Sequence, residues 1–220
     1  MSILYKINKY SGIYLFNAPN TLTYSLFNYL YNKFIVNLSG ADEEIKFFHK
    51  NGYLKPNLNF KKEVLELNNL LDKKSKIDHQ NGFTYHLNHD SIEIIKKILS
   101  TKKFIDFKNK IEKYFNLNMY LTDVKVSRNF PIDKNFEHKK NIYSNNYHVD
   151  YYTINFFKMF INLHDVDDTR GPMNLYSKRN SRKFIKSNNY RDRSNYTVKN
   201  EDKLGLVKNT GSTGDLFLCS

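Results

Sequence analysis

Residues 147–163 read YHVDYYTINFFKMFINL, a His-x-Asp pair followed by a largely apolar run. His148 and Asp150 are two positions apart, and residues at i and i+2 of a strand point to the same face. An imidazole nitrogen and a carboxylate oxygen would then project together. They are two of the three ligands of the 2-His-1-carboxylate facial triad, which holds non-haem Fe(II) and leaves coordination positions open. On its own the pair is a weak signal, because two such residues often occur by chance in an ordinary strand.

Further motifs accompany this pair in a fixed order along the chain. They are Phe47-Phe48-His49-Lys50-Asn51-Gly52-Tyr53-Leu54 upstream, and Leu163-His164-Asp165-Val166, Gly171-Pro172, Ser177-Lys178-Arg179 and Gly211-Ser212-Thr213-Gly214-Asp215-Leu216-Phe217-Leu218 downstream. With these motifs, about residues 45–220 resemble the phytanoyl-CoA dioxygenase-like family of Fe(II)/2-oxoglutarate-dependent oxygenases.

The resemblance implies a fold, a reaction and a metal site. The fold would be α+β, a double-stranded β-helix (jelly roll, cupin-like) with helices packed against its outer sheet. The reaction would be hydroxylation of a small-molecule or lipid-like substrate, with 2-oxoglutarate as cosubstrate and O2 as oxidant. Fe(II) would be held by His148 and Asp150 together with a second His.

In the family, the second His and the Arg that binds 2-oxoglutarate follow the Gly-Asp strand, whereas this sequence ends at Ser220. We therefore expect a truncated copy that is inactive alone and whose last strands are missing. Leu216, Phe217 and Leu218 would then form an exposed apolar edge, a template for aggregation. Whether the chain is an enzyme stays open, and the alternative is a non-catalytic jelly-roll protein that serves as a binding or scaffold module.

Two other clusters of polar residues compete for a metal and are interpreted as structural. His164, Asp165, Asp167 and Asp168 are expected in a turn, because Asp side chains bind neighbouring backbone N–H groups. His86, His89 and Asp90 are interpreted as the start of a helix, with Asp90 as its N-cap. The glycines of 211–214 lack the ending of a phosphate loop and indicate a β-turn. Cys219 is expected to be a small buried apolar residue.

Composition restricts the partners and the compartment. The chain has a net charge of +13, and its basic residues are spread along the sequence rather than gathered in one patch. We therefore do not expect nucleic acid as a partner, and an anionic substrate is another use for this charge. No apolar run reaches the length of a membrane span, so no membrane partner is expected. With the single cysteine, these features predict a cytoplasmic protein.

The periodicity of apolar residues predicts helices in the first half and strands in the second. Residues 1–40 are expected to be an N-terminal extension, and residues 41–220 one oxygenase-like domain with helices over about 41–116 and strands over about 117–220. The expected helices cover about 41–50, 60–71, 91–99 and 101–115, the last of them capped by Ser100. Apolar faces are expected at Val64, Leu65, Leu67 and Leu71, and at Phe104, Phe107, Ile111 and Phe115. Strands are expected at Met119, Leu121, Val124 and Val126, and a polar surface loop at 180–202.

Overall fold

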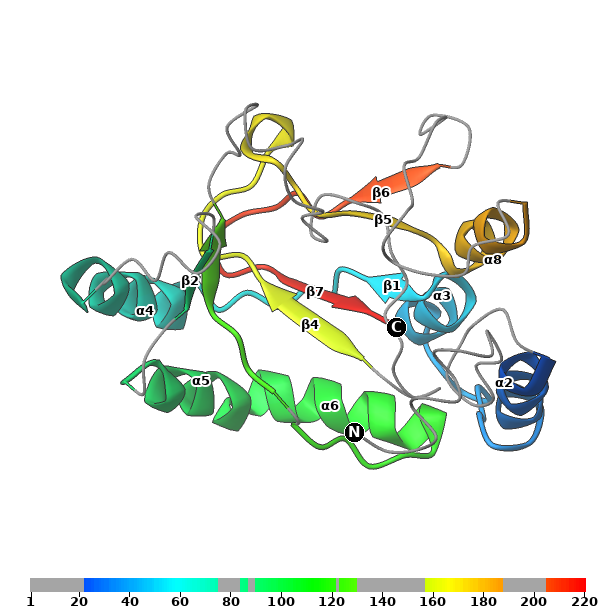
Figure 1. Ribbon diagram of the computed structural model, residues 1–220. Coiled ribbons are helices and arrows are strands. Elements are labelled where there is room, and N and C mark those ends of the chain that lie inside the picture. Colours follow the sequence, from blue (N-terminus) through cyan, green and yellow to red (C-terminus); the bar gives the residue numbers. More distant parts are fainter. Residues whose placement is uncertain (1–21, 75–83, 87–89, 122, 130–156, 188–204) are drawn as a thin grey trace, which may run out of the picture.

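A computed structural model describes residues 22–74, 84–86, 90–121, 123–129, 157–187 and 205–220 (Figure 1). The helices are α2 (Leu22–Phe34), α3 (Glu43–Asn51), α4 (Lys61–Lys74), α5 (Asp90–Ser100), α6 (Lys102–Phe115), the 3-10 helix η2 (Asp168–Arg170) and α8 (Lys178–Ser187). The strands are β1 (Tyr53–Leu54), β2 (Thr84–His86), β3 (Ser127–Asn129), β4 (Lys158–Ile161), β5 (Asn174–Tyr176), β6 (Leu206–Lys208) and β7 (Leu216–Cys219).

The start and the end of α3 follow from its capping residues. The Asp42 carboxylate accepts a hydrogen bond from the Ile45 N–H, and acidic Glu43 and Glu44 follow in the first turn, where the helix dipole favours them. Gly52 ends the helix in the left-handed conformation with φ 76°. The helix expected over about 41–50 is thereby confirmed.

Helix α6 also confirms its predicted face but not its predicted cap. Its four predicted apolar positions are all buried: Phe104, Phe107, Ile111 and Phe115. The N-cap is Thr101, whose side chain accepts from the Phe104 N–H, so the prediction of Ser100 was wrong by one residue. Ser100 is instead the last residue of α5, and its hydroxyl donates to the Lys97 carbonyl oxygen.

Three strands form an antiparallel sheet in the order β1-β7-β4. Because β7 is the central strand, Leu216, Phe217 and Leu218 are only 2%, 1% and 0% exposed. The prediction that these residues form an exposed apolar edge was therefore wrong. β1 pairs with the side of β7 that was predicted to be an exposed edge.

The β4–β7 pairing continues beyond the two strands. Ile161 pairs with Leu216, and the bridge between Val166 and Gly211 lies five residues further along each segment, in the same register. β5 and β6 then pair antiparallel in a shifted register, because η2 adds residues to one segment only. The two segments thus stay together from one sheet into the next.

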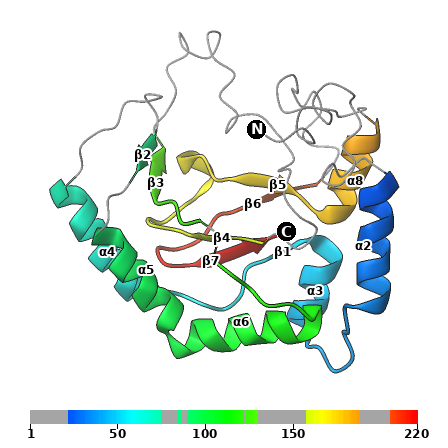
Figure 2. The same cartoon turned by 60° about the horizontal axis from the view of Figure 1, so that its bottom comes forward.

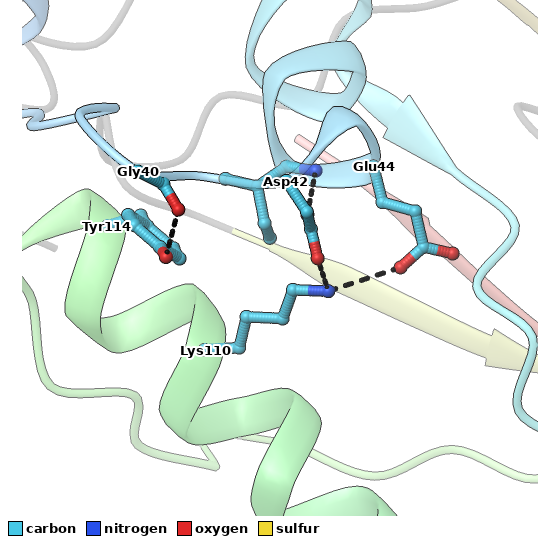
Figure 3. Close-up of polar contacts among 6 residues, drawn as sticks. Gly40, Asp42, Glu44, Lys110 and Tyr114 are labelled. Atoms are coloured by element: carbon cyan, nitrogen blue, oxygen red, sulfur yellow. Dashed lines mark hydrogen bonds and ion pairs between the residues drawn. The ribbon is translucent and has the colours of Figure 1, made fainter.

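The core lies between the β1-β7-β4 sheet and the helices on one side of it, and Figure 2 shows α4, α5, α6 and α3 following one another around that side. Val64 and Leu67 of α4 are buried, but Leu65, predicted on the same face, is 48% exposed. Leu71 has no described side chain. Lys110 and Tyr114 of α6 contact the N-terminal end of α3 (Figure 3).

Two predicted segments differ in the structure. The strands expected at 117–126 are not formed among the described residues, and Leu121 and Val124 are 63% and 40% exposed. The polar loop expected at 180–202 begins instead as the helix α8 (Lys178–Ser187), and its residues 188–202 lie outside the described part. Helix α4 continues to Lys74, beyond its predicted end at Leu71. Of the predicted N-terminal extension, residues 1–21 lie outside the described part.

Helices and small antiparallel sheets are thus both present, while the jelly roll stays a prediction. None of the described helices is long and apolar enough to cross a membrane.

Candidate functional site

The predicted metal ligands His148 and Asp150 lie outside the described residues, which end at Asn129 and resume at Phe157. Their geometry is therefore not part of the structure, and iron ligation stays a prediction. Within the described ranges, no group of three or more His, Cys, Asp or Glu side chains is arranged to hold a metal ion.

The strand that follows the predicted ligands, β4, has two faces with different surroundings. Met159 and Ile161 pack against the helix-side core together with Leu216 and Leu218 of β7. Since side chains alternate along a strand, Lys158 and Phe160 point to the other face. Lys158 lies directly opposite Cys219, and Phe160 directly opposite Phe217. This second face, called the inner face below, is directed toward β5 and β6 (Figure 1).

Aromatic rings and one lysine extend the inner face across β1. Tyr53 stacks on Phe217, with ring centroids 6.2 Å apart and an interplanar angle of 14°. The Lys55 ammonium lies 5.9 Å from the Phe217 centroid and donates to the carbonyl oxygens of Lys208 and Thr210, at 3.0 and 2.9 Å. Lys55 thereby connects the β1 segment to the end of β6 and to the residues that follow it.

Two asparagines form a buried polar contact where the β4–β7 segments turn toward β5 and β6. Asn162 and Asn209 are each 7% exposed, and Asn209 Nδ2 donates to Asn162 Oδ1 at 3.4 Å. Asn162 Nδ2 is buried and has no hydrogen-bond partner among the described residues. A Cβ at Gly211 would lie 3.2 Å from this nitrogen and 2.8 Å from Asp215 Oδ2, so a side chain here would require the Asp215 side chain to shift. This pair was not predicted from the sequence, although a polar Asn162 directly after the apolar strand could have signalled it.

The Gly-Ser-Thr-Gly-Asp motif forms a turn, as predicted. The Asp215 N–H donates to the Ser212 carbonyl oxygen at 3.0 Å, and Asp215 Oδ2 accepts from the Ser212 N–H at 2.7 Å. Asp215 Oδ1 also accepts from Asn59 Nδ2 at 2.7 Å, which attaches the turn to the start of α4. Asp215 is accordingly a structural residue that sets the beginning of β7.

The acidic residues after β4 bind one local and two distant partners. Asp165 accepts from the N–H and the hydroxyl of Thr213, and these two bonds lower the pKa of its carboxyl group. Asp167 accepts from the N–H and the hydroxyl of Thr169 and caps η2, which lowers its pKa in the same way. Asp168 forms an ion pair with Lys208. The predicted turn role is confirmed for Asp167, whereas Asp165 bonds a residue 48 positions away and so attaches two distant segments.

The structure describes some of the remaining candidate residues. Cys219 is partly buried and stands on the inner face. His86 is the last residue of β2, while His89 lies outside the described residues. Asp90 is already inside α5 as its first residue.

No protein-family model matches the chain, and no curated protein matches it.

Proposed function

We propose that the chain has the fold and the site of an Fe(II)/2-oxoglutarate-dependent oxygenase similar to the phytanoyl-CoA dioxygenase-like family, acting on a small-molecule or lipid-like substrate. His148 and Asp150 would be two of the iron ligands. The donor set fits this metal, since an imidazole and a carboxylate are the ligand types of non-haem Fe(II) sites. The proposal rests on the ordered motifs of the sequence and on the strand arrangement that follows these two residues.

The pairing of β4 with β7 is the observation that supports the proposal most directly. It joins the strand that follows the His-x-Asp pair to the strand that follows the Gly-Asp motif, with Phe160 opposite Phe217. The register continues to Val166 and Gly211, and the same two segments then pair again as β5 and β6. In jelly rolls, paired strands pass together from one sheet to the other. A fold alone does not fix a reaction, so the chemistry depends on His148 and Asp150.

The roles of the chain's own residues follow from their placement. Bound iron, with 2-oxoglutarate and O2, would supply the oxidising power for hydroxylation. The half-buried inner-face rings of Tyr53 and Phe160 would contact the apolar part of a substrate and exclude water, while the buried Phe217 ring supports Tyr53 by stacking on it. The net charge of +13 suits a substrate with an anionic group. The single cysteine suits a cytoplasmic location for this activity.

Metal binding tests the predicted ligands without requiring turnover. Mn(II) serves as an air-stable probe for the Fe(II) site, and its binding is followed by electron paramagnetic resonance. We expect the double variant His148→Ala/Asp150→Ala to bind Mn(II) at least about tenfold more weakly than the parent, since changes even to outer-shell partners have effects of this size. The double variant His164→Ala/Asp168→Ala removes the same residue types from an exposed turn and should bind as the parent does. Equal binding by all three proteins would exclude His148 and Asp150 as ligands.

Turnover separates the enzyme from its alternative. In a form of the protein that supplies a second His ligand and an Arg for 2-oxoglutarate, we expect succinate to form from 2-oxoglutarate in the presence of Fe(II) and O2, and this release to be lost in the His148→Ala/Asp150→Ala variant. Metal binding that depends on His148 and Asp150, without succinate release, would instead favour a non-catalytic jelly-roll protein that retains the metal site.

A further inference from the structure

Helix α2 presents an apolar face to its surroundings. Leu26, Tyr29 and Phe34 are 53%, 57% and 68% exposed, and Leu30 on the same side is 37% exposed. Positions 26, 29, 30 and 33 share one face of a helix. A surface helix of a globular protein normally carries polar residues on its outer side, so this face requires an explanation.

The other side of α2 attaches it to the rest of the protein. The Tyr31 hydroxyl donates to the Phe115 carbonyl oxygen of α6 at 2.5 Å, and burial raises the pKa of Tyr31 to about 12, which keeps this donor protonated. Asn32 Oδ1 lies 2.6 Å from His49 Nε2 of α3. These contacts fix which side of α2 is turned outward.

Lysine and aromatic rings are combined on the outward side. Lys33 is the one charged residue of α2. Its ammonium lies 5.5 Å from the Tyr29 ring centroid and 5.2 Å from that of Phe34. Tyr and Lys are residues that place an apolar body in hydrocarbon and a polar tip at a lipid headgroup.

A strongly basic helix lies at the same end of the molecule. α8 has the sequence KRNSRKFIKS, with five Lys and Arg residues and no acidic one, and Arg179 and Lys183 are exposed. α8 packs against α3, and burial together with the nearby charge of Lys178 lowers the pKa of His49, whose ring also contacts Asn32 of α2. Figures 1 and 2 both place α8 and α2 at one end, beside α3.

We propose that α2 and α8 together form a docking surface for an anionic lipid bilayer. α2 would lie in the interface plane with Leu26, Tyr29 and Phe34 in the acyl boundary, while the cations of α8 face lipid phosphates. With 13 residues, α2 is too short to span a bilayer and can only lie on it. This surface was not expected from the sequence, where only membrane spans were considered, and it does not rest on the proposed oxygenase activity.

The charges favour a lipid surface over two other occupants. A second copy of the chain would also have a net charge of +13 and would be repelled. A nucleic acid would use the basic residues of α8 but would leave the apolar face of α2 in water. An anionic bilayer would bury the apolar face of α2 and bind the cations of α8 at the same time.

Vesicle flotation with the full chain tests the apolar part of the surface. We expect binding to vesicles rich in phosphatidylglycerol and much weaker binding to pure phosphatidylcholine. The triple variant Leu26→Gln/Tyr29→Gln/Phe34→Gln should lower the partition coefficient at least about tenfold, since each side chain loses the burial of its exposed part. The control Leu65→Gln/Ile92→Gln/Ile105→Gln removes three similarly exposed apolar residues from α4, α5 and α6 and should partition as the parent does.

The charged part is tested in the same assay. Arg179→Gln/Lys183→Gln should weaken binding about fivefold for each charge removed, and added salt should weaken it further. The control Lys62→Gln/Lys102→Gln removes two exposed charges from α4 and α6 and should have a smaller effect.

Three outcomes would overturn the proposal. One is equal partitioning of the α2 variant and the parent. A second is a melting temperature that falls in the α2 variant without vesicles, which would mean that the protein itself covers this face. The third is tight binding of DNA that survives the α2 substitutions, in the absence of vesicle binding.

Discussion

Lys110 in α6 forms an ion pair with Asp42, the residue that caps the N-terminus of α3 (Figure 3). The same ammonium lies 3.3 Å from Glu44 Oε2, and the Tyr114 hydroxyl donates to the Gly40 carbonyl oxygen at 2.8 Å. Asp42 Oδ1 also accepts from the Ile45 N–H at 3.1 Å. One carboxylate therefore both begins α3 and attaches it to α6.

The two contributions of Asp42 can be separated by two substitutions. Asp42→Asn keeps an oxygen for the Ile45 N–H and removes the charge, so we expect a loss of at most about 1 kcal/mol, typical of a pair as exposed as this one. Asp42→Ala removes the cap as well and should cost about 1–2 kcal/mol. Urea unfolding measures both. An equal loss in the two variants would contradict the capping role.

Acid should reduce the difference between the parent and Asp42→Asn. The Lys110 ammonium, which hydrogen-bonds to Asp42, holds the pKa of this carboxyl group below its usual value of 3.8. A depressed carboxyl pKa stabilises the fold above the usual value, and this stabilisation is lost as the pH falls through the folded-state pKa. We expect the urea midpoints of the two proteins to converge below about pH 4. Midpoints that stay apart there would exclude this linkage.

A mild fall in pH should destabilise the protein through the protonation of His49. Burial, with the nearby charge of Lys178, lowers its pKa from the usual 6.5. The unfolded chain therefore takes up a proton before the folded one does, and stability falls as the pH drops below about 6.5. His49→Gln keeps a donor for Asn32 and should reduce the loss of stability between about pH 7.5 and about pH 5.5. His164→Gln, at an exposed position, should leave it unchanged.

Gly214 should tolerate no side chain. Its φ is 88°, and a Cβ would overlap the backbone of Phe60 and Lys61. We expect Gly214→Ala to destabilise the protein by more than about 2 kcal/mol, or to prevent folding, because both strain and overlap contribute. Gly171→Ala is the matched control, since φ is 66° there but no atom lies within 4 Å of the added Cβ. It should cost about 1 kcal/mol. If urea unfolding gave similar losses of unfolding free energy for Gly214→Ala and Gly171→Ala, the overlap of a Cβ at position 214 with the backbone of Phe60 and Lys61 would be excluded.

Hydrogen exchange should identify β7 as a protected strand. Leu216–Cys219 is hydrogen-bonded to β1 on one side and to β4 on the other. We expect peptides covering these residues to exchange far more slowly than those covering 117–121, which are not in a strand and expose Tyr120 and Leu121. Fast exchange in β7 would restore the edge strand predicted from the sequence.

Local signals predicted the helices well. The position of α3 follows from acidic residues before an apolar pattern and from Gly52 after it, and the buried face of α6 follows from its spacing. The α6 cap was misplaced because Ser100 and Thr101 are adjacent and both are good caps. α8 was missed because its many charges resemble a solvated loop, although Lys and Arg are good helix formers.

Long-range pairing could not be predicted from local patterns. Nothing near Leu216 indicates that Tyr53 and Leu54 pair with β7, so the strand was placed at an edge. Met119 packs against the core, yet Leu121 and Val124 are exposed, because an apolar pattern does not ensure a pairing partner. For the site, the turn role of Asp167 was predictable, whereas the bonds of Asp165 to Thr213 and the contact between Asn162 and Asn209 depend on the meeting of two distant segments.

The central position of β7 has a consequence for synthesis on the ribosome, where the chain emerges from its N-terminus. Helices α3 to α6 are made before Leu216 and Leu218, which complete their core. β1 can pair with β7 only after the residues of β7, about 165 positions later in the sequence, have been translated. A nascent chain shorter than residue 216 would therefore expose the apolar sides of these helices to chaperones, and the sheet would close only after Cys219 has left the ribosome.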